Sequence, residues 1–300
     1  MPENSSTSFT DSLPLSSPNS SLAFYSHCLM EQPIFSAFAA YTITNIVLLL
    51  PLCILVLCHG LKRWQQPHSS SASSTTAHSD SFTYHLVTME IVFFFGCIIC
   101  CCGSYINHFQ IIMVGINFLS FTWFGETFFQ PLTCMEHYLA VVHPITYLSL
   151  RKEKWIRIRN IITGGGWLFC FAGTALVTKE NISSVVRLCV LISSLIIISF
   201  CSLSILCVLI RPAPGRQDRD RMTVNQSKLK AFYTIVAILG VLLLRCPWNV
   251  LLTMLYVVNV MNAGCVVSLC ELWMRIPSTL VLPLLFLQRS GVLAGCKNIK

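Results

Sequence analysis

Charge is what this sequence has least of. Charged residues make up 11% of its 300 residues and hydrophobic residues 54%, whereas charged residues form roughly a quarter of a typical soluble protein. Because a protein that folds in water does not need so apolar a composition, we expect an integral membrane protein. The length suits seven helices of ~20 residues, each able to cross a bilayer, joined by short loops. We therefore expect one all-α membrane domain, a seven-transmembrane helix bundle.

The sequence also lacks the signals of secretion and of common enzymes. The first 33 residues contain no lysine or arginine. We therefore expect no cleaved signal peptide, which needs a basic region, and expect the first membrane helix to target the chain. HExxH and GxSxG motifs are absent. The three glycines at 164–166 lack the strand and the Lys-Ser/Thr of a phosphate loop, so they indicate close contact between helices. We expect no enzymatic activity and no cofactor.

A metal site is not expected either. Sixteen cysteines are present, but no two Cys-x-x-Cys pairs have the spacing of a zinc site. Most of these cysteines lie inside apolar runs, where cysteine acts as a small hydrophobic residue. This placement argues against a small, disulfide-rich secreted protein.

Seven apolar runs follow an N-terminal stretch rich in serine, proline and asparagine. We expect membrane helices at residues 34–57, 84–105, 109–142, 161–177, 185–210, 229–258 and 266–287. This pattern divides the chain into an extracellular glycosylated tail (1–33), a seven-helix membrane domain (34–288) and a short cytoplasmic tail (289–300).

The positions of the cations predict the orientation of the chain. Sixteen of the twenty lysines and arginines lie in the C-terminal tail and in the loops after the first, third and fifth expected helices. Cytoplasmic loops carry such an excess, so we expect the N-terminus outside a multi-pass plasma-membrane protein. With this orientation most lysines and arginines face the cytosol, so the net charge of +8 does not indicate nucleic-acid binding. The glycosylation sequons at Asn4, Asn19 and Asn181 fall outside, whereas the sequon at Asn225 falls in the cytosol.

The third expected helix ends in a recognisable motif. Glu136-His137-Tyr138 is followed by Leu-Ala-Val and, three residues later, by Pro144. This stretch resembles the third helix and second intracellular loop of rhodopsin-like (class A) G-protein-coupled receptors, in which the triplet is acidic-Arg-Tyr. The resemblance implies a cell-surface receptor that binds an extracellular ligand, with these four residues facing a heterotrimeric G protein.

Weaker matches to the same family occur in the other expected helices. Asn45 resembles a polar residue of the family's first helix, and Trp167 stands where its fourth-helix tryptophan falls. The run from Arg245 to Trp248 resembles a degraded Cys-Trp-x-Pro kink, and Pro283 retains only the proline of Asn-Pro-x-x-Tyr.

The missing arginine of the triplet leaves two other functions open. His137 is mostly uncharged near neutral pH, whereas arginine is always charged, so we expect weakened coupling to a G protein. One alternative is a receptor-like protein that does not couple. The other is a transporter or channel that uses its intramembrane charges as a permeation path, although the inverted repeats typical of transporters are not recognisable.

Glu90, Glu126, Arg245 and Arg275 lie within the expected helices. Each charge costs at least ~2.5–3.5 kcal/mol at a helix centre, so these side chains should face the bundle interior as its polar core, together with Asn45. Helical rise puts Glu126 and both arginines at similar depth and Glu90 nearer the cytosol. We therefore expect Glu126 to pair with one of the two arginines.

The remaining guanidinium is free to bind an acidic ligand, since one carboxylate cannot fully pair two arginines. Guanidinium recognises carboxylate through two parallel hydrogen bonds, so the candidate ligand-binding residues are Arg245, Arg275, Glu126 and Trp248. The resemblance also implies that a sodium ion binds near Glu90. The alternative is that an arginine side chain supplies the positive charge there.

Four cysteines lie near the expected outer face: Cys28, Cys189, Cys265 and Cys270. A bond from Cys28 to Cys265 or to Cys270 would resemble the bridge between the tail and the third outer loop of some receptors. The sequence alone leaves the connectivity open.

Overall fold

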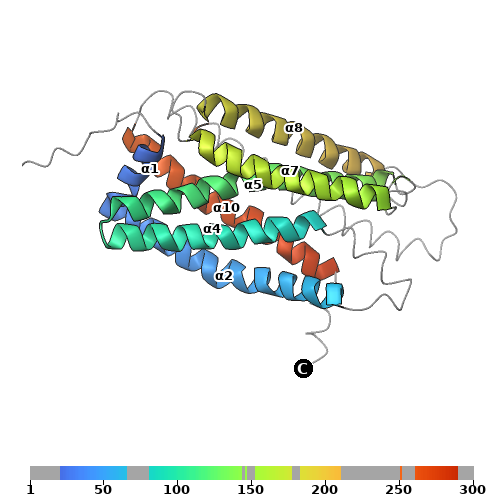
Figure 1. Cartoon of the computed structure of the whole chain (residues 1–300), viewed down its shortest axis with the longest axis horizontal. Helices are drawn as coiled ribbons and strands as arrows, with labels where there is room; N and C mark the ends of the chain where they lie inside the picture. Colours follow the sequence, from blue (N-terminus) through green and yellow to red (C-terminus); the bar gives the residue numbers. More distant parts are fainter. Residues whose placement is uncertain are drawn as a thin grey trace, which may run out of the picture.

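The computed structural model describes residues 21–65, 81–143, 146, 153–177, 183–210, 251 and 261–289. This part of the chain is helical almost throughout (Figure 1). The helices are α1 (Ser21–Met30), α2 (Gln32–Gln65), α4 (Ser81–Tyr105), α5 (Phe109–Val142), α7 (Glu153–Val177), α8 (Ser183–Ile210) and α10 (Met261–Arg289).

The long helices coincide with the expected apolar runs. Each run among the described residues is helical, while the run at 229–258 lies outside them except for Leu251. Among the described residues, four helices are long and apolar enough to cross a membrane: α2, α4, α5 and α8. The described part of the chain is therefore all-helical, and its long apolar helices are those of a membrane protein.

Asn107 shapes the sharp turn between α4 and α5. Its φ of 56° places it in the left-handed region, which asparagine tolerates better than most side chains. The amide of His108 donates to the carbonyl of Gly103 at 2.9 Å, and the amide of Asn107 donates to that of Ser104 at 3.2 Å. These two bonds form a Schellman motif, which satisfies carbonyls left open at the end of α4. The chain can then reverse at once into α5.

Glycines allow α4 and α5 to approach closely along the interface that follows this turn. A Cβ atom at Gly115 would lie 2.8 Å from the amide nitrogen of Cys100 and 3.0 Å from the carbonyl oxygen of Gly96. A Cβ at Gly103 would lie 2.7 Å from the amide nitrogen of Ile112. Only the absence of a side chain permits backbone contact at this distance, as in other small-residue interfaces of membrane helices.

The long helices lie side by side, and successive helices from α2 to α8 alternate in direction (Figure 1). α5 packs against α4, α7 and α8, whereas α2 packs against α4 and α10. One end of the bundle carries the turn between α4 and α5, together with α1 and the start of α10; we call it the α1 end. The opposite end carries the last turns of α2, α5 and α8 and the start of α7.

The segment expected to be only a tail contains a helix that packs on the bundle. α1 contacts α2, α4, α5 and α10 across the α1 end. A disulfide joins Cys28 of α1 to Cys265 at the start of α10, with a Cα–Cα distance of 5.4 Å. Cys270 is a free thiol. α1 was not predicted from the sequence, because ten residues between polar stretches carry little periodic signal and tertiary contacts stabilise so short a helix.

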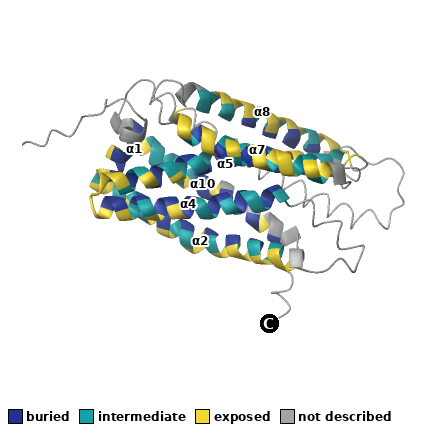
Figure 2. Cartoon of the chain, viewed as in Figure 1, coloured by how far each residue is buried: buried dark blue, intermediate teal, exposed yellow. Residues whose placement is uncertain are grey.

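Burial differs between the inner and outer helices of the bundle. Exposed residues follow the outer faces of α2, α7 and α8, whereas α4 is mostly buried or half-buried (Figure 2). Many of the exposed residues are large and apolar, among them Val47, Ile196 and Leu168. An apolar outer surface on long helices matches a lipid environment.

Candidate functional site

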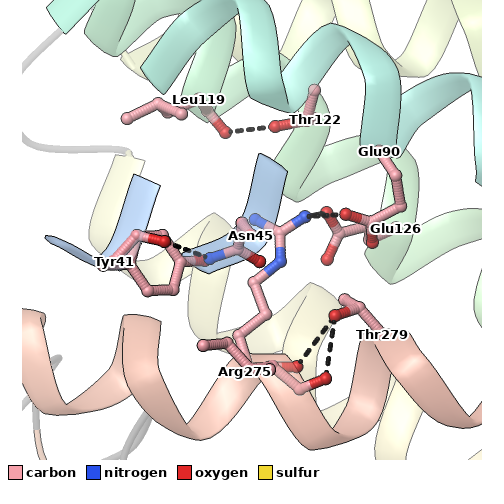
Figure 3. A network of polar contacts seen from close by, with 9 residues as sticks. Tyr41, Asn45, Glu90, Leu119, Thr122, Glu126, Arg275 and Thr279 are labelled. Atoms are coloured by element: carbon pink, nitrogen blue, oxygen red, sulfur yellow. Dashed lines mark hydrogen bonds and ion pairs between the residues drawn. The ribbon is translucent and has the colours of Figure 1, made fainter. Parts of the chain in front are cut away.

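A cluster of three charged side chains joins α4, α5 and α10 inside the bundle. The Arg275 guanidinium donates through Nη2 to Oε2 of Glu90 at 3.1 Å, and the same nitrogen contacts Oε1 of Glu126 (Figure 3). Each of the three side chains is at most 7% exposed. Glu90 and Glu126 are 185 and 149 residues from Arg275 in sequence, so the cluster ties together remote parts of the chain.

An aromatic ring covers the guanidinium. Cζ of Arg275 lies 3.5 Å from the centre of the Phe93 ring, within the range of a cation–π contact. Phe93 follows Glu90 by three residues on α4, so both side chains lie on the same helix face. One face of α4 therefore supplies both a carboxylate and a ring to the same cation.

The α10 backbone around Arg275 is stabilised locally. Thr279 Oγ1 donates to the carbonyl of Arg275 at 3.2 Å and to that of Ile276 at 3.1 Å. Pro277 lies inside this turn and lacks an amide proton, so it removes one helical hydrogen bond. The threonine hydroxyl adds polar contacts to the same turn.

α2 contributes two buried polar residues beside the cluster. Asn45 Nδ2 donates to the Tyr41 carbonyl of its own helix at 2.9 Å. The Tyr41 ring is 0% exposed. It meets Phe93 edge-on at 6.3 Å and lies 5.8 Å from the Trp273 ring on α10. These rings pack α2 against the helices that carry the charges.

The geometry makes the cluster an interhelical lock. Placing a charge in an apolar interior is costly unless it is paired and hydrogen-bonded, and removing one partner of a buried pair typically costs 3–5 kcal/mol. Glu126 meets Arg275, one of its two expected partners. Glu90 was expected to lie nearer the cytosol than Glu126 and was not expected to share its partner. In the bundle, Glu90 reaches the same guanidinium as Glu126.

No known protein family and no curated protein matches this sequence.

The family-like triplet lies in the last turns of α5, at the end opposite α1. Tyr138 Oη and His143 Nε2 form a hydrogen bond at 3.2 Å, and the Tyr138 ring lies 6.0 Å from the Phe200 ring of α8. Glu136 is half-buried. His137 belongs to α5, but its side chain is outside what the structure describes. The triplet thus lies at the contact between α5 and α8.

Other predicted site residues fall outside the described part of the chain. They are Asn4, Asn19, Pro144, Asn181, Arg245 and Trp248. Among the residues that the structure describes, no group of three or more His, Cys, Asp or Glu side chains could hold a metal ion.

Three further side chains of interest were not predicted from the sequence. Phe93 was not singled out, although its spacing from Glu90 is a usable signal. Glu271 lies one helical turn before Arg275 in α10, within an expected span, and is a further ionisable residue there. Arg187 of α8 lies with Cζ 5.0 Å from the centre of the Trp123 ring of α5. No sequence pattern indicated this pair, because the two residues are on different helices.

Proposed function

We propose that this chain is a seven-helix receptor of the plasma membrane, resembling the rhodopsin-like class, with its N-terminus outside. It binds an extracellular ligand and signals through a heterotrimeric G protein. The observation that carries the proposal is the position of the Glu136–Tyr138 triplet in the last turns of α5. There Tyr138 contacts α8, at the bundle end where the cation-rich loops begin. A motif that responds to ligand must lie where helices can move against one another on the cytosolic side.

The buried charge cluster favours a receptor over a transporter. A permeation path needs ionisable groups along a water-filled route. Here the Arg275 guanidinium instead meets two carboxylates and the Phe93 ring, with little exposure. Because this guanidinium is engaged within the bundle, Arg245 and Trp248 become the better candidates for contacting an acidic group of the ligand. Ligand-independent currents in cells expressing the chain would favour the transporter or channel instead.

The orientation predicts where glycans attach. Asn4, Asn19 or Asn181 should carry glycan, because the cation distribution puts them outside, and Asn225 should carry none. Glycosidase digestion of single Asn→Gln variants would show this as mobility shifts on a gel. A glycan on Asn225 would reverse the orientation and contradict the proposal.

His137 provides the test of signalling. If the family mechanism survives in weakened form, His137→Arg should raise ligand-independent G-protein activation severalfold, because arginine is permanently charged and longer. The unsubstituted chain should signal better at mildly acidic pH, where more of its imidazole is protonated. A second-messenger assay at equal surface expression measures both effects.

His137→Gln is the matched control for that experiment. Glutamine has similar polarity but no proton to gain in this range, so its signal should not rise with acid. If His137→Arg and acid both leave the signal unchanged while a known receptor responds in parallel, the non-coupling alternative is favoured.

A further inference from the structure

The exposed face of α7 is an apolar stripe that ends in a charge. Ile161, Leu168 and Phe171 are 66%, 71% and 62% exposed, and Gly164 lies exposed between them. Steps of three and four residues place these positions on one face of the helix. Arg157, four residues before Ile161, is exposed and continues the same face. Its side chain is therefore accessible from outside the bundle.

The depth of Arg157 matches the region of lipid headgroups. It lies in the second turn of α7, before the uncharged stretch that begins at Asn160. Trp155, two residues earlier, is 40% exposed, and tryptophan concentrates at membrane–water interfaces. Under the proposed orientation, on which this inference rests, that interface is cytosolic.

Two glycines leave part of the exposed face of α7 without side chains. No heavy atom lies within 4 Å of the position that a Cβ would take at Gly164 or at Gly165. Gly166 differs, because its Cβ would lie 2.6 Å from the Phe128 ring. The expected close helix contact is therefore made by Gly166 alone. The other two glycines leave bare backbone on the exposed face, between the large side chains of Ile161 and Leu168.

We propose that this face of α7 binds one anionic phospholipid of the cytosolic leaflet. The headgroup phosphate meets the Arg157 guanidinium, which recognises phosphate through paired hydrogen bonds. An acyl chain lies over the backbone at Gly164 and Gly165. Anionic lipids are concentrated in the cytosolic leaflet and attract cations near its surface. The apolar stripe requires a lipid, since a free phosphate would leave the stripe uncovered.

The test measures which lipids the full-length purified chain retains. The chain is incubated with equal amounts of phosphatidylserine and phosphatidylcholine, and the bound lipid is identified by native mass spectrometry. The chain should retain phosphatidylserine preferentially. Arg157→Gln should lower that preference about fivefold, corresponding to ~1 kcal/mol for one cation near the surface. Gly165→Leu should lower retention of phosphatidylserine while leaving Arg157 in place. Soluble glycerophosphoserine, which has no acyl chains, should not compete.

Lys62→Gln is the matched control. Lys62 is exposed in the last turn of α2, at the same end of the bundle, and its loss removes the same charge. It should keep the lipid preference within about twofold, since it removes only diffuse surface attraction. Equal losses in both variants, competition by the soluble headgroup, or no preference in the unsubstituted chain would overturn the proposal.

These measurements need neither ligand nor G protein. A chain that retains phosphatidylserine through Arg157 but never signals would refute the receptor and leave the lipid site standing. A chain that signals but shows no lipid preference would refute the lipid site and leave the receptor proposal standing. Reversed glycan positions would place Arg157 in the outer leaflet and refute both.

Discussion

Replacing Arg275 with glutamine should remove most of the folded protein from the cell surface. The substitution withdraws from Glu90 and Glu126 the guanidinium that both contact inside the bundle. Breaking a buried ion pair by removing one partner costs about 3–5 kcal/mol, a large share of the 5–15 kcal/mol that stabilises a typical domain. Surface labelling and thermal unfolding in detergent would measure the loss. Lys62→Gln, which removes an exposed cation, should change neither.

Removing the carboxylates as well should restore part of that loss. Glu126→Gln combined with Arg275→Gln replaces a contacting ionic pair with neutral amides, so the double variant should be more stable than the sum of the single effects predicts. Coupling of about 0.5–3 kcal/mol is typical for residues in one ion-pair network. A further Glu90→Gln substitution should restore more. Strictly additive effects would show that these side chains do not interact. That result would contradict a stabilising ion-pair cluster of Glu90, Glu126 and Arg275.

Adding one methyl group at Gly115 should destabilise the protein nearly as strongly. In Gly115→Ala the new Cβ would lie 2.8 Å from the Cys100 amide nitrogen and 3.0 Å from the Gly96 carbonyl oxygen. Backbone atoms cannot rotate away as a side chain can, so α4 and α5 must separate along their shared interface. Overpacking typically costs about 1–3 kcal/mol, and separation of α4 from α5 would also pull Glu90 and Glu126 out of their shared contact with Arg275. Thermal unfolding would measure it.

Gly164→Ala is the control for this prediction. It is the same chemical change in another helix, but no heavy atom lies within 4 Å of the new Cβ. Alanine is a better helix former than glycine by about 0.5–1 kcal/mol, so this variant should be as stable as the unsubstituted chain or slightly more stable. Equal destabilisation by both substitutions would mean that Gly115 does not mark a close helix crossing.

The apolar runs predicted the long helices well. α4 and α5 end and begin at the expected residues, 105 and 109, and α8 and α10 extend only a few residues beyond their expected starts. Apolar length is a local property of the chain, and a bilayer requires such runs to satisfy their backbone as helices. α1 escaped prediction because its helix depends on contacts with four other helices and on the bond between Cys28 and Cys265.

Residues within the site were predicted less completely than the helices. Glu126 was expected to pair with Arg245 or Arg275, because charges inside a membrane need opposite charges. The shared role of Glu90, the ring of Phe93 and the different surroundings of Gly164 and Gly166 were not anticipated. Each depends on which way a residue points around its helix and on how neighbouring helices tilt and slide. An estimate of depth along one helix specifies neither the direction of a side chain around that helix nor the tilt and shift of the neighbouring helices.

The sequence by itself therefore determined that the chain forms long apolar helices, where along the chain they lie, and which residues are charged inside them. Only the tertiary structure decided that one guanidinium is shared between α4 and α5, that Cys28 bonds Cys265, and that Gly115 faces backbone while Gly164 faces outward. The physical reason is that helix formation in a membrane follows from local composition and the hydrogen bonds of each helix. Partners are chosen by rotation, tilt and side-chain packing between helices.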